Sequence, residues 1–283
     1  MQKTKSTAQI LNEILQSYSL KNHSKQKGKL HEKYQIILML LQKEFSEGLA
    51  DTPFQSGSLA KGTAINVKFD LDMVVPFRRD VFSSPEDMFK QVEKVLRKGE
   101  LKPRLQKVSL GIKALKVNEN KTMYVDVVPG LEIQKNSYKN TKDLLLFNRI
   151  EKSVIKTNLE RQFKHIKSQD NQILAVIRFM KMWNHKETNI NLKSYMLELL
   201  TINANKNKRY DKLKDKLLWN FEYISNHLDL PLKDPGNASN TNLLSEIKPS
   251  TIKDIKNRMA KIHKKLKVGF DTSDEKIIKS FFC

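Results

Sequence analysis

The sequence predicts an α+β protein with two lobes, a mixed α/β lobe over residues 1–150 and a helical lobe over residues 151–283. Runs that alternate between apolar and polar residues, as strands do, occur mainly in the first half, between helical patterns. Beyond about residue 130, nearly every segment carries apolar residues at helical spacing. With 283 residues the chain is long enough to bury two cores of this kind.

Composition narrows the class of protein before any motif is considered. Hydrophobic residues make up 39% of the chain, which is typical of a globular protein. No run reaches the roughly 18 apolar residues of a membrane helix, and the start of the chain lacks the apolar core of a signal peptide. The only cysteine, Cys283, excludes an internal disulfide and a cysteine metal cluster. We therefore expect a cytoplasmic protein that does not enter a membrane.

The charge balance favours an anionic partner. The chain has 52 Lys and Arg against 31 Asp and Glu, a net charge of +21. Such a balance raises the affinity for polyanions through steering and counterion release. The partner could be a nucleotide substrate, a nucleic acid or both, although a lysine-rich proteome would give the same balance.

The first elements lead directly to a distinctive turn. We expect a short helix over residues 5–17 and a long amphipathic helix over residues 29–47, ending at Gly48. A short strand over residues 53–56 follows. Gly57 then allows a tight turn and a close approach of the backbone, and the amides that follow Ser58 can receive phosphate oxygens. A lone Gly-Ser turn is usually only a surface turn, so this stretch needs support from its neighbours.

That support comes from two aspartates in the next strand. Side chains alternate along a strand, so Asp70 and Asp72 should point to one face while the apolar residues beside them point to the other. Two neighbouring carboxylates repel each other unless a cation lies between them, and a hard divalent ion with oxygen ligands suits that position. We therefore predict a Mg²⁺ site next to a phosphate-binding turn. The strand is expected to stop at Pro76.

A third carboxylate lies farther along the chain. After a helix over residues 85–98, two β-like runs over residues 106–117 and 121–128 form an expected hairpin, with a turn at residues 118–120. Asp126 lies inside the second run, where an ionised carboxylate either pairs with a cation or faces a cleft. Near Asp70 and Asp72 it would complete the ligands of two metal ions, which can align an attacking hydroxyl with a leaving pyrophosphate.

The rest of the chain predicts helices. Residues 131–150 look irregular, and helical patterns follow over residues 154–168, 171–185, 192–203, 210–228, 251–266 and 273–282.

Together these motifs resemble those of the polymerase-β-type nucleotidyltransferases, which have a bilobed fold. The first set comprises Gly57-Ser58, Lys61-Gly62-Thr63-Ala64, Asp70-x-Asp72 and Asp126-Val127-Val128-Pro129. More narrowly, the chain resembles the bacterial cGAS/DncV-like nucleotidyltransferases (CD-NTases). That narrower resemblance is carried by Arg178 to Asn184, Leu192 to Leu200, and Asp234-Pro235-Gly236-Asn237 followed by Asn240 and Asn242. It spans roughly residues 30–265.

The resemblance implies an enzyme that joins NTPs into a cyclic di- or trinucleotide second messenger, with release of pyrophosphate. It implies two Mg²⁺ ions, which Mn²⁺ could replace, held by Asp70, Asp72 and Asp126. It also implies a role in anti-phage signalling of the CBASS type, with a downstream effector that senses the product. The nucleotide is expected to contact Gln55, Gly57, Ser58, Lys61, Lys181, Ser194, Tyr195, Asp234 and Asn237. Two departures are mild: Lys61 stands where the family often has arginine, and Met73 where it often has a β-branched residue.

The helix expected near residues 251–266 offers a second use for the positive charge. One face is apolar, and the other carries Lys253, Lys256, Arg258, Lys261, Lys264 and Lys265. This face could bind an activating RNA, or it could simply be a solvated helix face. Two other functions also stay open, a templateless linear synthase of the oligoadenylate or tRNA-end type and a non-catalytic RNA-binding module. We expect a monomer.

Overall fold

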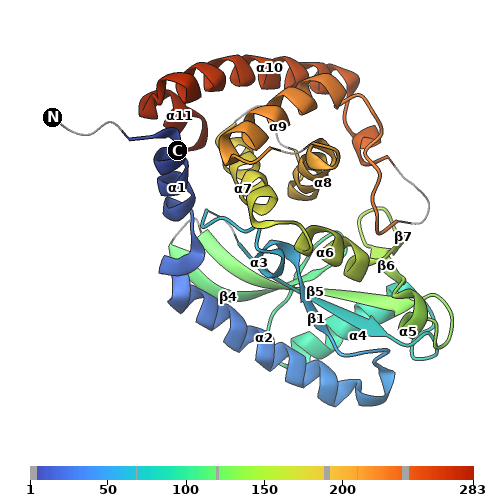
Figure 1. Ribbon diagram of the computed structural model, residues 1–283. Helices are drawn as coiled ribbons and strands as arrows, with labels where there is room; N and C mark the ends of the chain where they lie inside the picture. Colours follow the sequence, from blue (N-terminus) through green and yellow to red (C-terminus); the bar gives the residue numbers. More distant parts are fainter. Residues whose placement is uncertain (1–4, 68, 119–120, 188–191, 209, 238–241) are drawn as a thin grey trace.

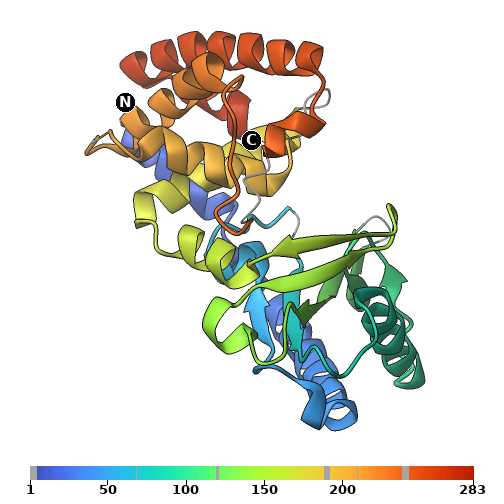
Figure 2. The same cartoon turned by 90° about the vertical axis from the view of Figure 1, so that its right-hand side faces the viewer.

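The computed structural model describes residues 5–283 apart from 68, 119–120, 188–191, 209 and 238–241. It contains a sheet lobe and a helical lobe, as predicted (Figure 1). Figure 2 shows the helical lobe stacked above the sheet lobe in a second view. Residues 119–120 of the expected turn and the motif residue Asn240 lie outside the described residues. In the part of the chain that the structure describes, we find no helix that is long and apolar enough to cross a membrane.

The sheet lobe is built on a mixed sheet, in which the described residues form seven strands. The strand order is β1-β2-β5-β4-β3, with β6 pairing with β5 and β7 pairing with β6. Only β2 and β5 run parallel, and the other pairs are antiparallel. The strands are β1 (Phe54–Ser56), β2 (Leu71–Phe77), β3 (Arg104–Leu105), β4 (Leu110–Asn118), β5 (Lys121–Glu132), β6 (Leu144–Asn148) and β7 (Ser153–Thr157).

Two long helices, α2 (Ser24–Glu44) and α4 (Pro85–Lys98), cover one face of this sheet. Their buried apolar residues form one core with the inward side chains of β2, β4 and β5. The start of α4 follows the expected signals, because Ser84 Oγ accepts the N–H of Asp87 and Pro85 fills the first turn. The short elements of this lobe are η1 (Leu20–His23), η2 (Ser46–Gly48), α3 (Gly57–Lys61) and α5 (Tyr138–Thr141).

The helical lobe has its own apolar core. Its helices are α6 (Leu159–Lys167), α7 (Asn171–Lys186), α8 (Ser194–Asn205), α9 (Leu213–His227), η3 (Leu243–Glu246), α10 (Pro249–Thr272) and α11 (Glu275–Phe282). The first helix, α1 (Thr7–Ser17), also belongs here, because Ile10, Leu11 and Ile14 are fully buried in the same core. Figure 1 shows α1 beside α11, although the two helices lie at opposite ends of the sequence.

Several boundaries differ from the sequence prediction. The sheet continues through Thr157, beyond the expected lobe boundary at residue 150, since β7 replaces the start of the helix predicted at residues 154–168. The segment expected to be irregular contains β6. Pro76 does not end β2, which continues to Phe77. The pairing of β2 with β1 stops at Val74, so the N–H that proline lacks is not needed there. The carbonyl oxygen of Pro76 still accepts the N–H of Ala50.

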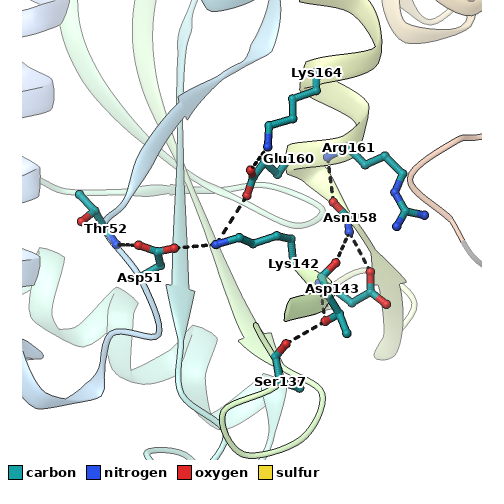
Figure 3. A network of polar contacts seen from close by, with 10 residues as sticks. Asp51, Thr52, Ser137, Lys142, Asp143, Asn158, Glu160, Arg161 and Lys164 are labelled. Atoms are coloured by element: carbon teal, nitrogen blue, oxygen red, sulfur yellow. Dashed lines mark hydrogen bonds and ion pairs between the residues drawn. The ribbon is translucent and has the colours of Figure 1, made fainter. Parts of the chain in front are cut away.

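The chain crosses between the lobes at Asn158, which is 2% exposed. Asn158 Nδ2 donates to the backbone oxygen of Thr141 (2.7 Å) and to Asp143 Oδ1 (2.9 Å), while Asn158 Oδ1 accepts the N–H of Arg161 and caps α6. Figure 3 shows this network, in which Lys142 extends between Asp51 and Glu160. These bonds fix the direction in which α6 leaves the sheet lobe.

Candidate active site

The parallel pairing of β2 and β5 brings two of the predicted aspartates together. Asp72 is the direct neighbour of Asp126 across this pair. On the outer sides, Asp72 pairs with Ser56 of β1 and Asp126 pairs with Gly111 of β4. Residues in register on adjacent strands point to the same face, so the two carboxylates share one face at the centre of the sheet.

The Gly-Ser turn is built against Asp72. Gly57 has a φ of 73°, a backbone conformation that side chains rarely adopt. A Cβ atom on Gly57 would lie 1.7 Å from Oδ2 of Asp72, so only glycine leaves room for this carboxylate. Ser58 follows immediately in α3, and Gln55 lies on β1 opposite Met73. The predicted turn therefore lies against an acid pair formed by two of the three predicted aspartates, Asp72 and Asp126.

The two carboxylates repel each other in a partly buried setting. Burial and the charge of Asp126 raise the pKa of Asp72 from 3.8 to about 7, while Lys61 opposes this increase. Gln106 supports Asp126 by donating from Nε2 to Oδ1 at 2.6 Å. The pair thus has the electrostatic character of a cation site, in which a divalent ion would remove the repulsion.

Asp70 lies differently from the sequence prediction. It precedes β2 rather than forming part of it, and its Oδ1 accepts the backbone N–H of Tyr124 at 3.0 Å. Its charge still contributes to the raised pKa of Asp72. Among the described residues, no three His, Cys, Asp or Glu side chains gather as a metal-binding group in this arrangement.

A second charged cluster lies where the lobes meet. Lys61 of α3 and Lys181 of α7 are 8% and 7% exposed, and both contact Glu198 of α8, which is 2% exposed. The distances are 3.1 Å from Lys61 Nζ to Glu198 Oε2 and 2.6 Å from Lys181 Nζ to Glu198 Oε1. Thr63 Oγ1 donates to Glu198 Oε1 at 2.7 Å and accepts from Lys181 Nζ at 3.0 Å.

A cavity of about 370 Å³ opens beside this cluster. The two lobes line it jointly, with Ser58 and Thr63 on one side and Lys181 and Ser194 on the other. Three of these four were predicted to contact a nucleotide. The three aspartates are not part of its lining, but Ser58 connects the cavity with the acid pair through Gly57.

The other predicted nucleotide contacts lie at the edge of this region. The ring centroid of Tyr195 lies 5.2 Å from Lys61 Nζ, and its hydroxyl donates to Asp234 Oδ1 at 2.7 Å. Asp234 also accepts from Gln162 Nε2 (2.7 Å) and from the N–H of Gly236 (2.8 Å). Asn237 closes the turn by donating its N–H to the backbone oxygen of Asp234. These hydrogen bonds show that Asp234 holds Tyr195, Gln162 and the following turn in place. Its contact with a nucleotide stays a prediction.

Sequence reasoning assigned no role to Glu198, Thr63 or Gln106, although the first two lie within motifs quoted for the resemblance. Glu198 carried a signal, because it is a carboxylate within the apolar helical run Met196 to Leu200. Thr63 belongs to the motif Lys61-Gly62-Thr63-Ala64, but no role was assigned to it. Gln106 carried no signal, because a glutamine before a strand is common on surfaces. Their roles depend on which elements pack together.

No protein-family model matches the sequence, and no curated protein matches it. The structure, in contrast, is similar to solved structures over almost its whole length. CdnC of E. coli MS115-1, solved with ATP, has 17% identity and a TM-score of 0.75, covering 99% of this chain and 96% of that one. The CD-NTase CdnG of Bradyrhizobium diazoefficiens, solved with GTP, has 12% identity and a TM-score of 0.76, with 96% and 94% coverage.

A further match is the DncV cyclic AMP-GMP synthase of Vibrio cholerae, described as a prokaryotic cGAS homolog. It has 16% identity and a TM-score of 0.66, covering 82% of this chain and 69% of that one. All these identities are low, so the similarity concerns the fold. This chain has the fold of the bacterial CD-NTases, which is the polymerase-β-type fold that its motifs predicted.

Proposed function

We propose that this chain is a Mg²⁺-dependent nucleotidyltransferase that joins NTPs into a cyclic di- or trinucleotide second messenger and releases pyrophosphate. The observation that carries the proposal is the register of Asp72 with Asp126 beside a glycine turn that leaves room for the carboxylate. An acid pair and a phosphate-binding turn in one site suit the transfer of a nucleotidyl group.

The acid pair would hold the metal. Asp72 and Asp126 share one face of the sheet, and Asp70 would join them when it exchanges the N–H of Tyr124 for a cation. Bound Mg²⁺ would supply the positive charge that stabilises the attacking oxygen and the departing pyrophosphate. Mn²⁺ has similar ligand preferences and is expected to replace it.

The cavity between the lobes would hold the triphosphate. Ser58 and the amides after Gly57 would donate to the β- and γ-phosphate oxygens, and Lys181 and Ser194 would approach from the other lobe. We thus propose that the sheet lobe, predicted as residues 1–150, supplies the metal ligands and the phosphate-binding turn, and that the helical lobe adds further phosphate contacts and the base contacts. Gln55, Lys61, Tyr195, Asp234 and Asn237 are the further contacts we propose.

The reaction is a substitution at the α-phosphorus. A ribose hydroxyl oxygen forms a bond to this phosphorus, the bond to the bridging oxygen breaks, and pyrophosphate leaves with those electrons. The hydroxyl proton passes to a carboxylate at the site or to water. A second transfer within the same site closes the ring.

The solved structures support a cyclic product over a linear one. DncV is named as a cyclic AMP-GMP synthase and was solved with the linear intermediate pppA(3′,5′)pG. CdnC of E. coli was also solved in complex with a HORMA protein lacking its N-terminus. For this chain we propose a CBASS-type role in the cytoplasm, in which the product activates a separate effector.

The six basic residues predicted to bind RNA lie on α10. Ile255, Met259, Ile262 and Leu266 bury its other face, as the periodicity predicted. Lys256 pairs with Asp229 and Arg258 pairs with Glu187, while Lys253, Lys261, Lys264 and Lys265 are exposed. We propose that these four lysines are the part of the face available to an activating RNA.

Product analysis tests the proposed function. The purified protein is incubated with Mg²⁺ and four labelled NTPs, with and without RNA, and the products are treated with phosphatase. A phosphatase-resistant product in the wild type and none in Asp126→Asn supports a cyclic synthase. A ladder of phosphatase-sensitive products would indicate a linear synthase, and no product under any condition would favour a non-catalytic module.

A further inference from the structure

Glu198 is a buried acid that the proposed reaction does not use directly. Its carboxylate contacts three side chains, and two of them, Lys61 and Thr63, come from the sheet lobe. The third, Lys181, comes from the neighbouring helix of its own lobe. Glu198 therefore links the lobes at the point where both contribute to the cavity.

The charges in this cluster do not balance. Two ammonium groups contact a single carboxylate, and a buried ammonium without a partner is several kcal/mol unfavourable in proteins. The charged groups that face Lys181 are Glu198 on α8, Lys61 on α3 and Asp72 on β2. Burial lowers the pKa of Lys181, Glu198 and Asp72 oppose this decrease, and Lys61 adds to it. Without Glu198, the Lys181 ammonium would lose its proton more readily.

The position of the cluster connects it to ligand binding. Lys181 and Thr63 line the cavity together with Ser58 and Ser194. Glu198 is absent from this lining, so it lies behind Lys181 rather than in the wall of the cavity. An anion in the cavity would meet Lys181 directly but not Glu198, and the acid Glu187, which does line the cavity, is paired with Arg258.

We propose that Glu198 is a positioning residue, which holds Lys181 charged and in place at the wall of a triphosphate-binding cavity and joins it to Lys61 of the opposite lobe, which lies outside the lining. The inference rests on the proposed function in one respect, that this cavity receives a nucleotide triphosphate. It adds that anion affinity depends on a carboxylate that does not touch the anion.

The test compares Glu198→Gln with the wild type. Isothermal titration in the presence of Mg²⁺ measures the Kd of ATP and of inorganic tripolyphosphate between about pH 6.5 and 8.5. The ratio of the variant Kd to the wild-type Kd cancels the titrations that both proteins share. We expect this ratio to rise with pH, by up to about tenfold per unit, as Lys181 deprotonates in the variant.

Two further variants sharpen the result. Glu198→Asp keeps the charge, so its Kd ratio should not depend on pH. In the double variant Glu198→Gln, Lys181→Arg, the guanidinium stays protonated, so the dependence on pH should disappear. A purely structural role of Glu198 would produce neither pattern.

Glu132→Gln is the matched control. Glu132 is 1% exposed and accepts the N–H groups of Arg79, Asn136 and Tyr138, so it is as buried as Glu198 but contacts no lysine side chain among its described bonds. This variant should lower the melting temperature without a Kd ratio that depends on pH.

The outcomes separate this inference from the proposed function. A Kd ratio for Glu198→Gln that stays constant with pH, or an equal rise in Glu132→Gln, would overturn the inference even if the wild type makes a cyclic product. A rising ratio in a protein that makes no product would support the inference and contradict the proposed function. If the wild type binds neither probe, the inference is wrong.

If circular dichroism shows that Glu198→Gln is unfolded, Thr63→Val is used instead with the same criteria. Its Kd ratio is expected to rise less, by about threefold per pH unit.

Discussion

Two acidic centres lie close together in this protein, and the fold treats them in opposite ways. Glu198 is surrounded by cations: burial raises its pKa, but Lys181 and Lys61 more than offset this and the pKa is lowered. Asp72 faces a second carboxylate, and its pKa is raised to about 7. The protein thus neutralises the acid at the lobe interface with its own side chains, whereas we propose that an external cation neutralises the acid pair on the sheet.

The largest expected effect comes from removing the proposed metal ligands Asp70, Asp72 and Asp126. The double variant Asp70→Ala, Asp72→Ala, and separately Asp126→Asn, should lower product formation by a factor of about a thousand or more, because the metal charge is lost from the transition state. Product formation with labelled NTPs measures this. Retained activity would place the active site elsewhere.

Gly57→Ala should have the next largest effect. The added Cβ would collide with the Asp72 carboxylate, and alanine is strained at a φ of 73°. We expect about a hundredfold lower turnover and a loss of about 1–3 kcal/mol in unfolding free energy. Gly28→Ala, which lies in α2 with nothing within 4 Å of a new Cβ, is the control and should keep wild-type turnover while raising the unfolding free energy by about 0.5–1 kcal/mol. Wild-type turnover in Gly57→Ala would contradict the close packing of turn and acid.

The raised pKa of Asp72 predicts a dependence of stability on pH. Between about pH 4 and 7 the folded protein holds a proton on Asp72 that the unfolded chain has released, so this contribution to stability is lost as pH rises through that window. In EDTA, Asp72→Asn should therefore become more stable than the wild type above pH 7, by roughly 1–3 kcal/mol. Urea denaturation at about pH 5 and pH 8 measures the difference. An equal difference at both values would indicate that Asp72 is not perturbed.

The smallest effect on product formation is expected from changes to the basic face of α10. Changing the exposed residues Lys253, Lys261, Lys264 and Lys265 to alanine should leave thermal stability and basal turnover unchanged. RNA affinity should fall by about tenfold or more at low salt, and the dependence of log Kd on log salt should become shallower by up to about 3. Gel shifts across a salt series measure this. An unchanged slope would show that RNA does not bind this face of α10.

The sequence predicted most of the sheet that carries the acid pair, because alternation marks β2 and β5 clearly. It could not predict that the two strands are parallel neighbours with Asp72 opposite Asp126, since register depends on contacts distant in sequence. The strand β6 was missed because Leu144–Asn148 is a short apolar run without alternation.

The contacts between the lobes were even harder to predict from the sequence. The amphipathic pattern of α1 is visible in the sequence, but nothing local indicates that Ile10 and Ile14 pack in the helical lobe rather than the first one. The sequence indicated only that Glu198 is an acid within an apolar helical segment. Its contact with Lys61 requires α3 and α8 to pack together, and nothing local in either segment indicates that packing.

The most direct test of the central claim is Mn²⁺ binding measured by electron paramagnetic resonance in the wild type, Asp126→Asn and Glu132→Gln. If Asp72 and Asp126 form a divalent-cation site, the wild type and Glu132→Gln should bind Mn²⁺ with similar affinity, and Asp126→Asn should bind at least about tenfold more weakly. Equal Mn²⁺ affinity in the wild type and Asp126→Asn would contradict the account.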